Sequence, residues 1–227
     1  MPLAVVTGGS AGLGRALAHT LADDGWTVVT DGRDPGRLSA AMAGVPGVVA
    51  VAGDVTDPAH RAALVTEVAR LGRLDLLVHN ASTLGPLPLG PLRELGEAAL
   101  RTTWETNTAA PLALTRLLLP QLAASRGVVL SISSDAAVEH YETWGPYAAS
   151  KAALDHLTLT LAAEESLTAY AVDPGDMQTA MHQDAFPGED ISDLPLPETV
   201  APHLLALVRS RPSSGRYRVA DLATVGA

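Results

Sequence analysis

The sequence has no cysteine, only one lysine and only two asparagines. Without cysteine the chain cannot form disulfides, use a thiolate in catalysis or bind a metal through sulfur. Its seven histidines show no HExxH or His-x-His spacing, so the sequence predicts no metal site. The formal net charge of −10 argues against nucleic acid or anionic lipid as a partner.

Long uninterrupted apolar segments are also missing. The richest, Pro111–Leu122, contains Arg116 and Pro120 and falls short of the roughly 18 residues that a membrane span needs. The first residues run directly into a strand pattern, with no charged leader before it. We therefore expect a cytoplasmic protein that has no membrane partner.

What remains is the composition of a folded protein: 227 residues, of which 47% are hydrophobic. No linker or repeat divides the chain, so residues 1–227 are predicted to form one domain. Short β-branched runs alternate with Ala/Leu-rich helical stretches, and this predicts a doubly wound α/β fold with seven strands in a mostly parallel sheet. The expected strands are Leu3–Thr7, Thr27–Thr30, Val48–Ala52, Leu74–His79, Val128–Ser133, Thr168–Val172 and Tyr217–Val219.

One segment departs from this alternation. Residues Asp176–Pro197 are rich in Asp, Pro and Gly and lie between the sixth strand and a final helix predicted over Thr199–Arg209. Long loops in compact domains tend to be lids or binding loops. We therefore predict that this segment closes over a substrate.

The first strand ends in Thr7-Gly8-Gly9-Ser10-Ala11-Gly12-Leu13-Gly14, a TGxxxGxG pattern that opens a helix. Glycines at such a turn let the backbone approach a pyrophosphate, whose charge the helix N-terminus stabilises. The alternative is a plain tight turn between strand and helix. The position directly after the first strand favours a nucleotide site.

The single lysine, Lys151, follows Tyr147 by four residues, so both side chains share one face of a helix. A free phenol titrates near pH 10, and a neighbouring ammonium favours the phenolate. The pattern therefore predicts a tyrosine whose pKa is lowered so that it can exchange a proton. The alternative is that Tyr147 and Lys151 are an ordinary i,i+4 pair on the surface that has no chemical role.

With these motifs and five other matches in the same order, nearly the whole chain resembles the short-chain dehydrogenase/reductase family. The others are Asp54-Val55 after the third strand, His79-Asn80-Ala81-Ser82 after the fourth, Ser133-Ser134 after the fifth, and Pro174-Gly175 with Thr179 after the sixth, while Asn107 falls at the family's helix asparagine. His79 and Ser82 stand where the family's NNAG motif has asparagine and glycine. The resemblance implies a Rossmann-like fold and hydride transfer between a nicotinamide cofactor and a carbonyl compound.

The resemblance also implies the roles of individual residues. The predicted catalytic residues are Asn107, Ser134, Tyr147 and Lys151, with Ser133 as the alternative serine. Tyr147 exchanges the proton, the serine polarises the carbonyl, Lys151 holds the nicotinamide ribose, and Asn107 holds a water that links the lysine to solvent. The predicted cofactor-binding residues are Gly8, Ser10, Gly12, Leu13, Gly14, Arg33, Asp54, Val55, Asn80, Ala81, Ser82, Tyr147, Lys151, Pro174, Gly175 and Thr179.

The choice of cofactor depends on the end of the second strand. The ribose-binding aspartate of NAD-preferring relatives would fall on Gly32, and Arg33 follows, as in relatives that pair an arginine with the 2′-phosphate of NADP. This favours NADP(H), with NAD(H) as the alternative. Asp31 would repel the phosphate if its side chain turned inward.

The sequence therefore predicts an NAD(P)H-dependent oxidoreductase that interconverts a ketone or aldehyde and an alcohol. The alternatives are a nucleotide-sensing regulator or scaffold, and a non-redox lyase or cyclase that uses the same acid–base pair. Trp144 and Tyr141 suggest an aromatic pocket for a partly apolar small molecule. Met177, Met181, His182 and Phe186 lie on the predicted lid, where Met181 and His182 could instead be packing anchors. The resemblance implies a homodimer or homotetramer.

Overall fold

Seven short strands form a parallel sheet in the computed structural model, which describes residues 1–165 and 167–222. The strand order is β3-β2-β1-β4-β5-β6-β7, and every neighbouring pair is parallel. This confirms the predicted doubly wound, Rossmann-like architecture. The strands are β1 (Leu3–Val6), β2 (Thr27–Gly32), β3 (Val48–Ala52), β4 (Leu76–His79), β5 (Val128–Ile132), β6 (Thr168–Asp173) and β7 (Gly215–Arg218).

β3 matches the sequence prediction at both ends, and the other six strands differ from it by one or two residues at one or both ends; β2 and β7 show why. β2 continues two residues beyond Thr30 because Gly32 still pairs with Ala52 of β3. β7 begins at Gly215, which pairs with Tyr170 of β6. Glycine and arginine have low strand propensity, so here the neighbouring strand rather than the local sequence determines the extended backbone.

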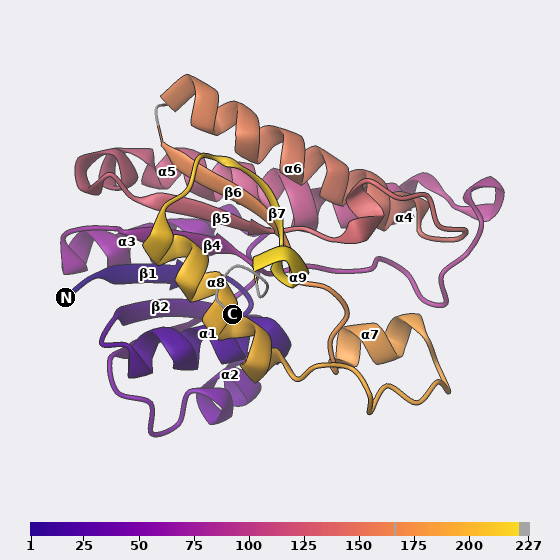
Figure 1. Ribbon diagram of the computed structural model, residues 1–227, viewed down its shortest axis with the longest axis horizontal. Helices are drawn as coiled ribbons and strands as arrows, with labels where there is room; N and C mark the ends of the chain where they lie inside the picture. The colour runs from indigo at the N-terminus through magenta and orange to yellow at the C-terminus, as the bar shows by residue number, and fades with distance from the viewer. Residues whose placement is uncertain (166, 223–227) are drawn as a thin grey trace.

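Helices cover both faces of the sheet (Figure 1). The α-helices are α1 (Gly12–Asp23), α2 (Pro35–Ala41), α3 (Pro58–Leu71), α4 (Glu97–Trp104), α5 (Ala110–Ser125), α6 (Gly145–Glu165), α7 (Ala180–Ala185), α8 (Pro197–Ser210) and α9 (Val219–Leu222). The short helices are η1 (Leu92–Glu94), η2 (Glu105–Ala109) and η3 (Asp135–Ala137), and η2 is a π-helical turn that joins α4 to α5.

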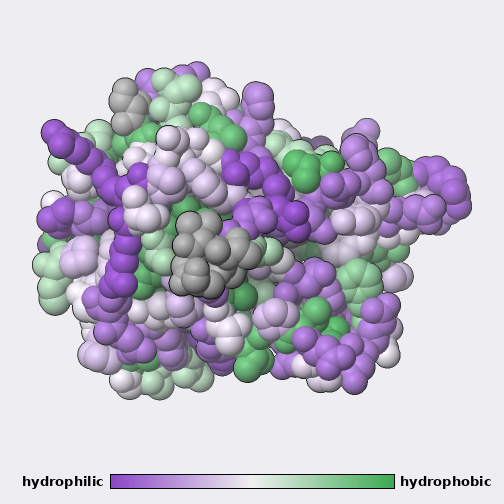
Figure 2. All heavy atoms as spheres, in the orientation of Figure 1, coloured by the Kyte–Doolittle hydropathy of each residue, from purple (hydrophilic) through white to green (hydrophobic). Residues whose placement is uncertain are grey.

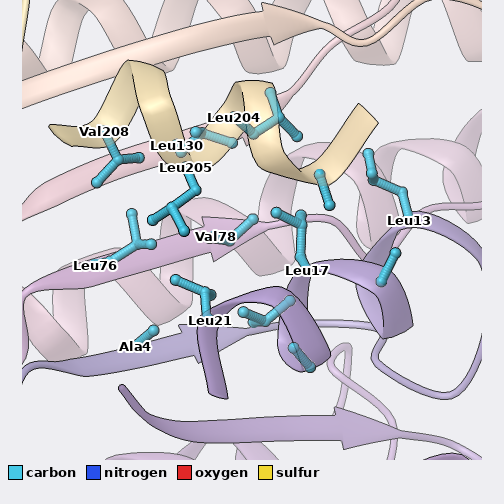
Figure 3. Close-up of a cluster of buried hydrophobic side chains, with 14 of the residues drawn as sticks. Ala4, Leu13, Leu17, Leu21, Leu76, Val78, Leu130, Leu204, Leu205 and Val208 are labelled. Carbon is cyan, nitrogen blue, oxygen red and sulfur yellow. The ribbon is translucent and has the colours of Figure 1, made fainter. Parts of the chain in front are cut away.

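Alternation along β1 divides the core between the two faces. Ala4 and Val6 pack with α1 and α8 on one face, whereas Leu3 and Val5 pack with α3 and α5 on the other. Figure 3 shows the first of these clusters, in which leucines of α1 and α8 meet over β1 and β4. Because both faces are covered, the strands are almost continuously apolar.

The predicted lid, residues 176–197, projects from the body of the molecule and carries the short helix α7 (Figure 1). On the face shown in Figure 2, polar residues predominate and hydrophobic residues form small separate groups. Within residues 1–165 and 167–222, no helix combines the length and apolar character needed to cross a bilayer.

The strand order creates a crevice at the carboxyl ends of β1 and β4. The chain passes from β1 to β2 on one side, but β4 pairs with β1 on the other side. The loops that leave β1 and β4 therefore diverge, and in open α/β sheets ligands bind at such a switch point.

His79, the last residue of β4, is buried in a setting that keeps its ring neutral. Its Nε2 lies 2.7 Å from Oγ1 of Thr115, and Nδ1 has no hydrogen-bond partner among the described residues. Thr115 Oγ1 already donates to the Pro111 carbonyl, so Nε2–H is the donor to Thr115. Burial lowers the pKa of His79 to about 3.

We predict that His79 makes the protein acid-sensitive. As the pH falls below about 6.5, the unfolded chain binds a proton at this position that the folded chain does not, so stability falls by about 1.4 kcal/mol per pH unit from this residue. The free energy of unfolding is measured in urea at several pH values between about 4 and 7. In His79→Asn, the decrease per pH unit that His79 contributes should be absent. The exposed His156→Asn is the matched control and should keep the slope; equal slopes in all three proteins would contradict the prediction.

Candidate active site

A cavity of about 620 Å³ lies at the carboxyl ends of the strands. It is lined by the loops that follow β1 to β6 and by α7, and therefore by segments from most of the chain length. Every predicted cofactor-binding residue except Gly14 lines it, and so does every predicted catalytic residue except Asn107. The fold thus brings the sequence motifs into one place.

The glycine loop meets the geometric demands expected of a pyrophosphate site. Gly8 and Gly12 have φ angles of 76° and 52°, in the left-handed region that side chains disfavour. A Cβ on Gly14 would lie 2.2 Å from the Gly8 carbonyl oxygen, so Gly14 supports the loop from behind and does not line the cavity. Ala11 at the N-terminus of α1 provides no side-chain cap, which leaves the first amides of α1 available for an anion.

Thr7 and Asn80 connect the glycine loop to the end of β4. The amides of Asn80 and Ala81 donate to Thr7 Oγ1 at 3.0 and 3.1 Å. The side-chain amide of Asn80 donates to the Thr7 carbonyl at 2.8 Å and to the Gly8 carbonyl at 3.3 Å. The Asn80 side chain, predicted to bind cofactor, is therefore engaged in shaping the loop.

Asp31 faces the loop, and partners engage both of its carboxylate oxygens. Oδ1 accepts a 2.6 Å hydrogen bond from the Gly8 amide, and Oδ2 lies 3.0 Å from Nε2 of His60. Only 2% of the residue is exposed. Arg33 is exposed and lines the cavity at the adjacent position. The end of β2 thus presents Arg33 to a ligand, while the Asp31 carboxylate is engaged by the Gly8 amide and His60.

Ser134 and Tyr147 meet in the cavity, while the hydroxyl of Ser133 points elsewhere. The Ser134 hydroxyl lies near enough to the Tyr147 hydroxyl to act on the pKa of Tyr147, and it donates to Asp135 Oδ1 at 2.9 Å. Ser133 donates to Oδ2 of Asp155 at 2.7 Å instead. The geometry therefore favours Ser134 over Ser133 as the residue beside the reacting group.

Lys151 is 2% exposed, and its ammonium lies 5.6 Å from the centre of the Tyr147 ring. It donates to the Ile132 carbonyl at 2.7 Å, and burial lowers its pKa to about 8 while the attraction of Asp155 acts in the opposite direction. Burial also raises the pKa of Tyr147 well above its ordinary value, while the neighbouring hydroxyls of Ser134 and Ser82 act to lower it. The expected lowering of the Tyr147 pKa is thus wrong in this structure, because burial disfavours the charged form of each partner.

Asn107 lies one layer behind the cavity, in the π-helical turn η2. Its Oδ1 accepts from the Thr83 amide and from Ser82, and its Nδ2 donates to the Thr83 carbonyl and to Ser150. Both amide protons and both acceptor positions of the Asn107 side chain are therefore used by protein atoms. The contacts show Asn107 fastening the loop after β4 to α6; its part in a proton relay stays a prediction.

Arg216 of β7 connects three parts of the site that the sequence analysis did not associate with it. Its Nε lies 3.1 Å from Asp155 Oδ2, and its Nη2 donates to the Ser134 carbonyl at 2.8 Å. Asp173 lies 3.7 Å away. Asp155 follows Lys151 by one helical turn, a signal that the sequence does offer, whereas nothing local identifies Arg216.

The substrate end of the cavity has aromatic walls contributed by two segments. Trp144 packs edge-on against Tyr147 at 5.6 Å between ring centres and lies 5.8 Å from Phe186. His182 lies against Phe186 at 4.8 Å. The lid segment thus contacts the segment between Ser134 and Tyr147. Thr179, predicted to contact the cofactor, lines the cavity and also caps α7 by accepting from the His182 amide at 3.2 Å.

Comparison with known proteins agrees with this geometry. A family model described as short chain dehydrogenase matches residues 2–190. The chain belongs to the short chain dehydrogenase family. A curated relative in this family, L-fucose dehydrogenase of Bos taurus, is 34% identical over 184 residues, which are 79% of this chain and 67% of that protein.

Solved structures of this family superimpose on nearly the whole chain. The crystal structure of the KRED1-Pglu enzyme is 34% identical with a TM-score of 0.86, covering 96% of this chain and 100% of that one. A short chain dehydrogenase from Escherichia coli CFT073 complexed with NADPH is 30% identical with a TM-score of 0.89, covering 96% of each chain. The chain is therefore an oxidoreductase of this family by both sequence and fold.

We predict that Arg216 stabilises the fold through its contacts with Asp155 and the Ser134 carbonyl. Arg216→Gln removes charged donors from Asp155 and from the Ser134 carbonyl, and we expect a loss of about 2 kcal/mol in the free energy of unfolding. The matched control is Arg218→Gln, because Arg218 also faces Asp173, at 3.9 Å, but its side chain is 59% exposed. That variant should change stability by no more than about 0.5 kcal/mol in urea unfolding. Equal losses in the two variants would contradict the prediction.

Proposed function

We propose that this protein interconverts a ketone or aldehyde and an alcohol by hydride transfer, with NADP(H) as the favoured cofactor. The observation that carries the proposal is the contact of Ser134 with the Tyr147 hydroxyl at the cavity, with the buried ammonium of Lys151 behind the tyrosine ring. Reduction of a carbonyl needs a proton donor and a polarising hydrogen bond at one oxygen, and these two hydroxyls can supply both.

The residues around the cavity fit a dinucleotide. The glycine loop leaves room for a pyrophosphate, the N-terminus of α1 can stabilise its charge, and Arg33 can pair with a 2′-phosphate. A bound nicotinamide supplies the hydride in reduction and accepts it in oxidation. Relatives of known structure complexed with NADP or NADPH support the phosphorylated cofactor.

In this proposal, Tyr147 gives its proton to the developing alkoxide while Ser134 donates a hydrogen bond to the same oxygen. Lys151 stabilises the phenolate that Tyr147 becomes, because the two side chains lie on one face of α6. The aromatic walls formed by Trp144 and Phe186 exclude water and favour a partly apolar substrate. The segment 176–197 serves as the substrate-binding loop.

Assembly and location belong to the proposal as well. We infer a homodimer or homotetramer in the cytoplasm, with no nucleic acid or membrane partner. On α5, Leu114 and Leu118 are fully buried in the core, whereas Leu117 is 47% exposed. The Leu117 side chain is therefore available for contact with a second subunit.

We predict that Tyr147→Phe abolishes most of the activity. Loss of the proton donor should lower kcat by roughly 100-fold or more while NADPH affinity stays unchanged, measured by nicotinamide absorbance with a panel of ketones and by cofactor fluorescence titration. Tight NADPH binding without oxidation by any ketone or aldehyde in the wild type would overturn the enzyme proposal. That result would favour a nucleotide-sensing protein instead.

We predict that Arg33 determines the preference for NADP(H). Arg33→Ala should raise KM for NADPH by about tenfold or more, because a charged hydrogen-bonding partner of the phosphate is lost, and should leave KM for NADH unchanged. The exposed Arg37→Ala on α2 is the matched control and should affect neither cofactor. A wild type that uses NADH as well as NADPH would refute the role assigned to Arg33.

A further inference from the structure

Asp135 is placed beside the reacting centre, and the sequence analysis did not assign it a role. It follows Ser134 directly, begins the turn η3 and lines the cavity. Its Oδ1 accepts from Ser134 Oγ at 2.9 Å and from the Ala136 amide at 2.7 Å, and its Oδ2 accepts from the Tyr141 hydroxyl at 2.8 Å.

The carboxylate of Asp135 is held in its charged form. Burial alone would raise its pKa, but the hydrogen bonds from Tyr141, Ser134 and the Ala136 amide keep the pKa of Asp135 below its ordinary value. A charged acceptor therefore lies next to the position where a substrate oxygen would bind.

The hydroxyl of Ser134 has only one proton, and Asp135 accepts it in the absence of substrate. To polarise a substrate carbonyl, Ser134 must turn this proton away from Asp135 Oδ1. Oδ1 then keeps the Ala136 amide but loses its second donor, and leaving a partly buried charged acceptor short of a hydrogen bond is unfavourable. A substrate that brings its own donor to Oδ1 removes this disadvantage.

The short distance between the two groups suits a donor close to the carbonyl. Oγ of Ser134 and Oδ1 of Asp135 are 2.9 Å apart, so two neighbouring atoms of one substrate can reach both of them. A hydroxyl on the carbon next to the carbonyl satisfies this, because its oxygen lies close to the carbonyl oxygen when the two groups are on the same side.

The charges that line the cavity also favour a neutral hydroxyl over a carboxylate at this position. Among the described residues that line the cavity, the arginine is Arg33, next to Asp31 and Asp54 of the cofactor region, and the lysine is Lys151, behind Tyr147. Asp135, Asp173 and Asp176 line the cavity as well, and Asp173 is next to Pro174 and Gly175. The guanidinium of Arg216 lies outside the cavity lining and is engaged by Asp155 and the Ser134 carbonyl, so a substrate carboxylate beside the carbonyl would meet the negative charge of Asp135.

We propose that the substrate is an α-hydroxy ketone, or a vicinal diol in the direction of oxidation, and that Asp135 is the residue that recognises the adjacent hydroxyl. This rests on the proposed function, since it assumes that Ser134 binds the reacting oxygen. Asp135 Oδ1 accepts the hydrogen bond of the adjacent hydroxyl while Ser134 donates to the carbonyl.

The test compares aryl ketones that differ only beside the carbonyl. We expect kcat/KM for 2-hydroxyacetophenone to exceed that for 2-methoxyacetophenone by about tenfold or more, since the ether keeps the activating oxygen but has no proton to donate. Benzoylformate, which places a carboxylate at the same position, should be the poorest substrate of the three. The ratio of two kcat/KM values is independent of the fraction of active enzyme.

Variants of Asp135 test whether this residue causes the preference for the hydroxy ketone. In Asp135→Asn, which keeps an acceptor for the turn, and in Asp135→Ala, the hydroxy-to-methoxy ratio should fall to about 3 or less. The exposed Glu139→Gln, four residues away, should keep the wild-type ratio. Because two variants and a ratio are used, loss of folded protein in one variant does not obscure the result.

Two results would overturn the inference alone: equal kcat/KM for the hydroxy and methoxy ketones in the wild type, or a full ratio retained in both Asp135 variants. Failure of the proposed function has a different signature. In that case no ketone or aldehyde oxidises NADPH or NADH at all, and the inference falls with it.

Discussion

The pairing of β1 with β2 on one side and with β4 on the other is the constraint on which the site depends. It places the glycine loop and the loop after β4 at the edge formed by the carboxyl ends of the strands, where hydrogen bonds between Thr7 and Asn80 hold the two loops together. The parallel arrangement brings the ends of β5 and β6 to the same edge, so Ser134 and Pro174 reach the same cavity. Because both faces of the sheet are covered by helices, this edge is the place where polar groups of several strands can meet a ligand.

The polar groups at this edge are held by partners rather than left to solvent. Asp31 is engaged by His60 and by the Gly8 amide, and Lys151 by the Ile132 carbonyl. Asp155 is engaged by Arg216 and Ser133. Each buried charge that lost its partner would be strongly unfavourable, so these contacts fix the positions of the loops as well as their charges.

Burial also acts on the proposed acid–base pair. It lowers the pKa of Lys151 to about 8, so the ammonium is still the main form at neutral pH, and it raises the pKa of Tyr147, so the phenol is neutral. A neutral phenol is the form that gives a proton in ketone reduction. Asp135, held charged beside Ser134, adds an acceptor at this centre, and the aromatic contacts of Trp144 and Phe186 form the apolar wall nearby.

Much of this protein follows from local sequence. The apolar runs predicted the strands and the doubly wound sheet, the order of the motifs carried the resemblance to the family, and the spacing of Tyr147 and Lys151 predicted their shared helix face. These features are local because strand and helix periodicity, and the need for glycine at positive φ, act within a few residues. The extent of β7, by contrast, is determined by pairing with β6.

Long-range contacts decided the rest. The choice of Ser134 over Ser133, the engagement of Asp31 by His60 and the reach of Arg216 under the active site depend on side chains that are far apart in sequence. The direction of the Tyr147 pKa also depends on burial, which no i,i+4 spacing reveals. The sequence alone determined which residues are available for chemistry; the tertiary structure decided which of them touch and which are charged, because burial and partner choice are properties of the folded whole.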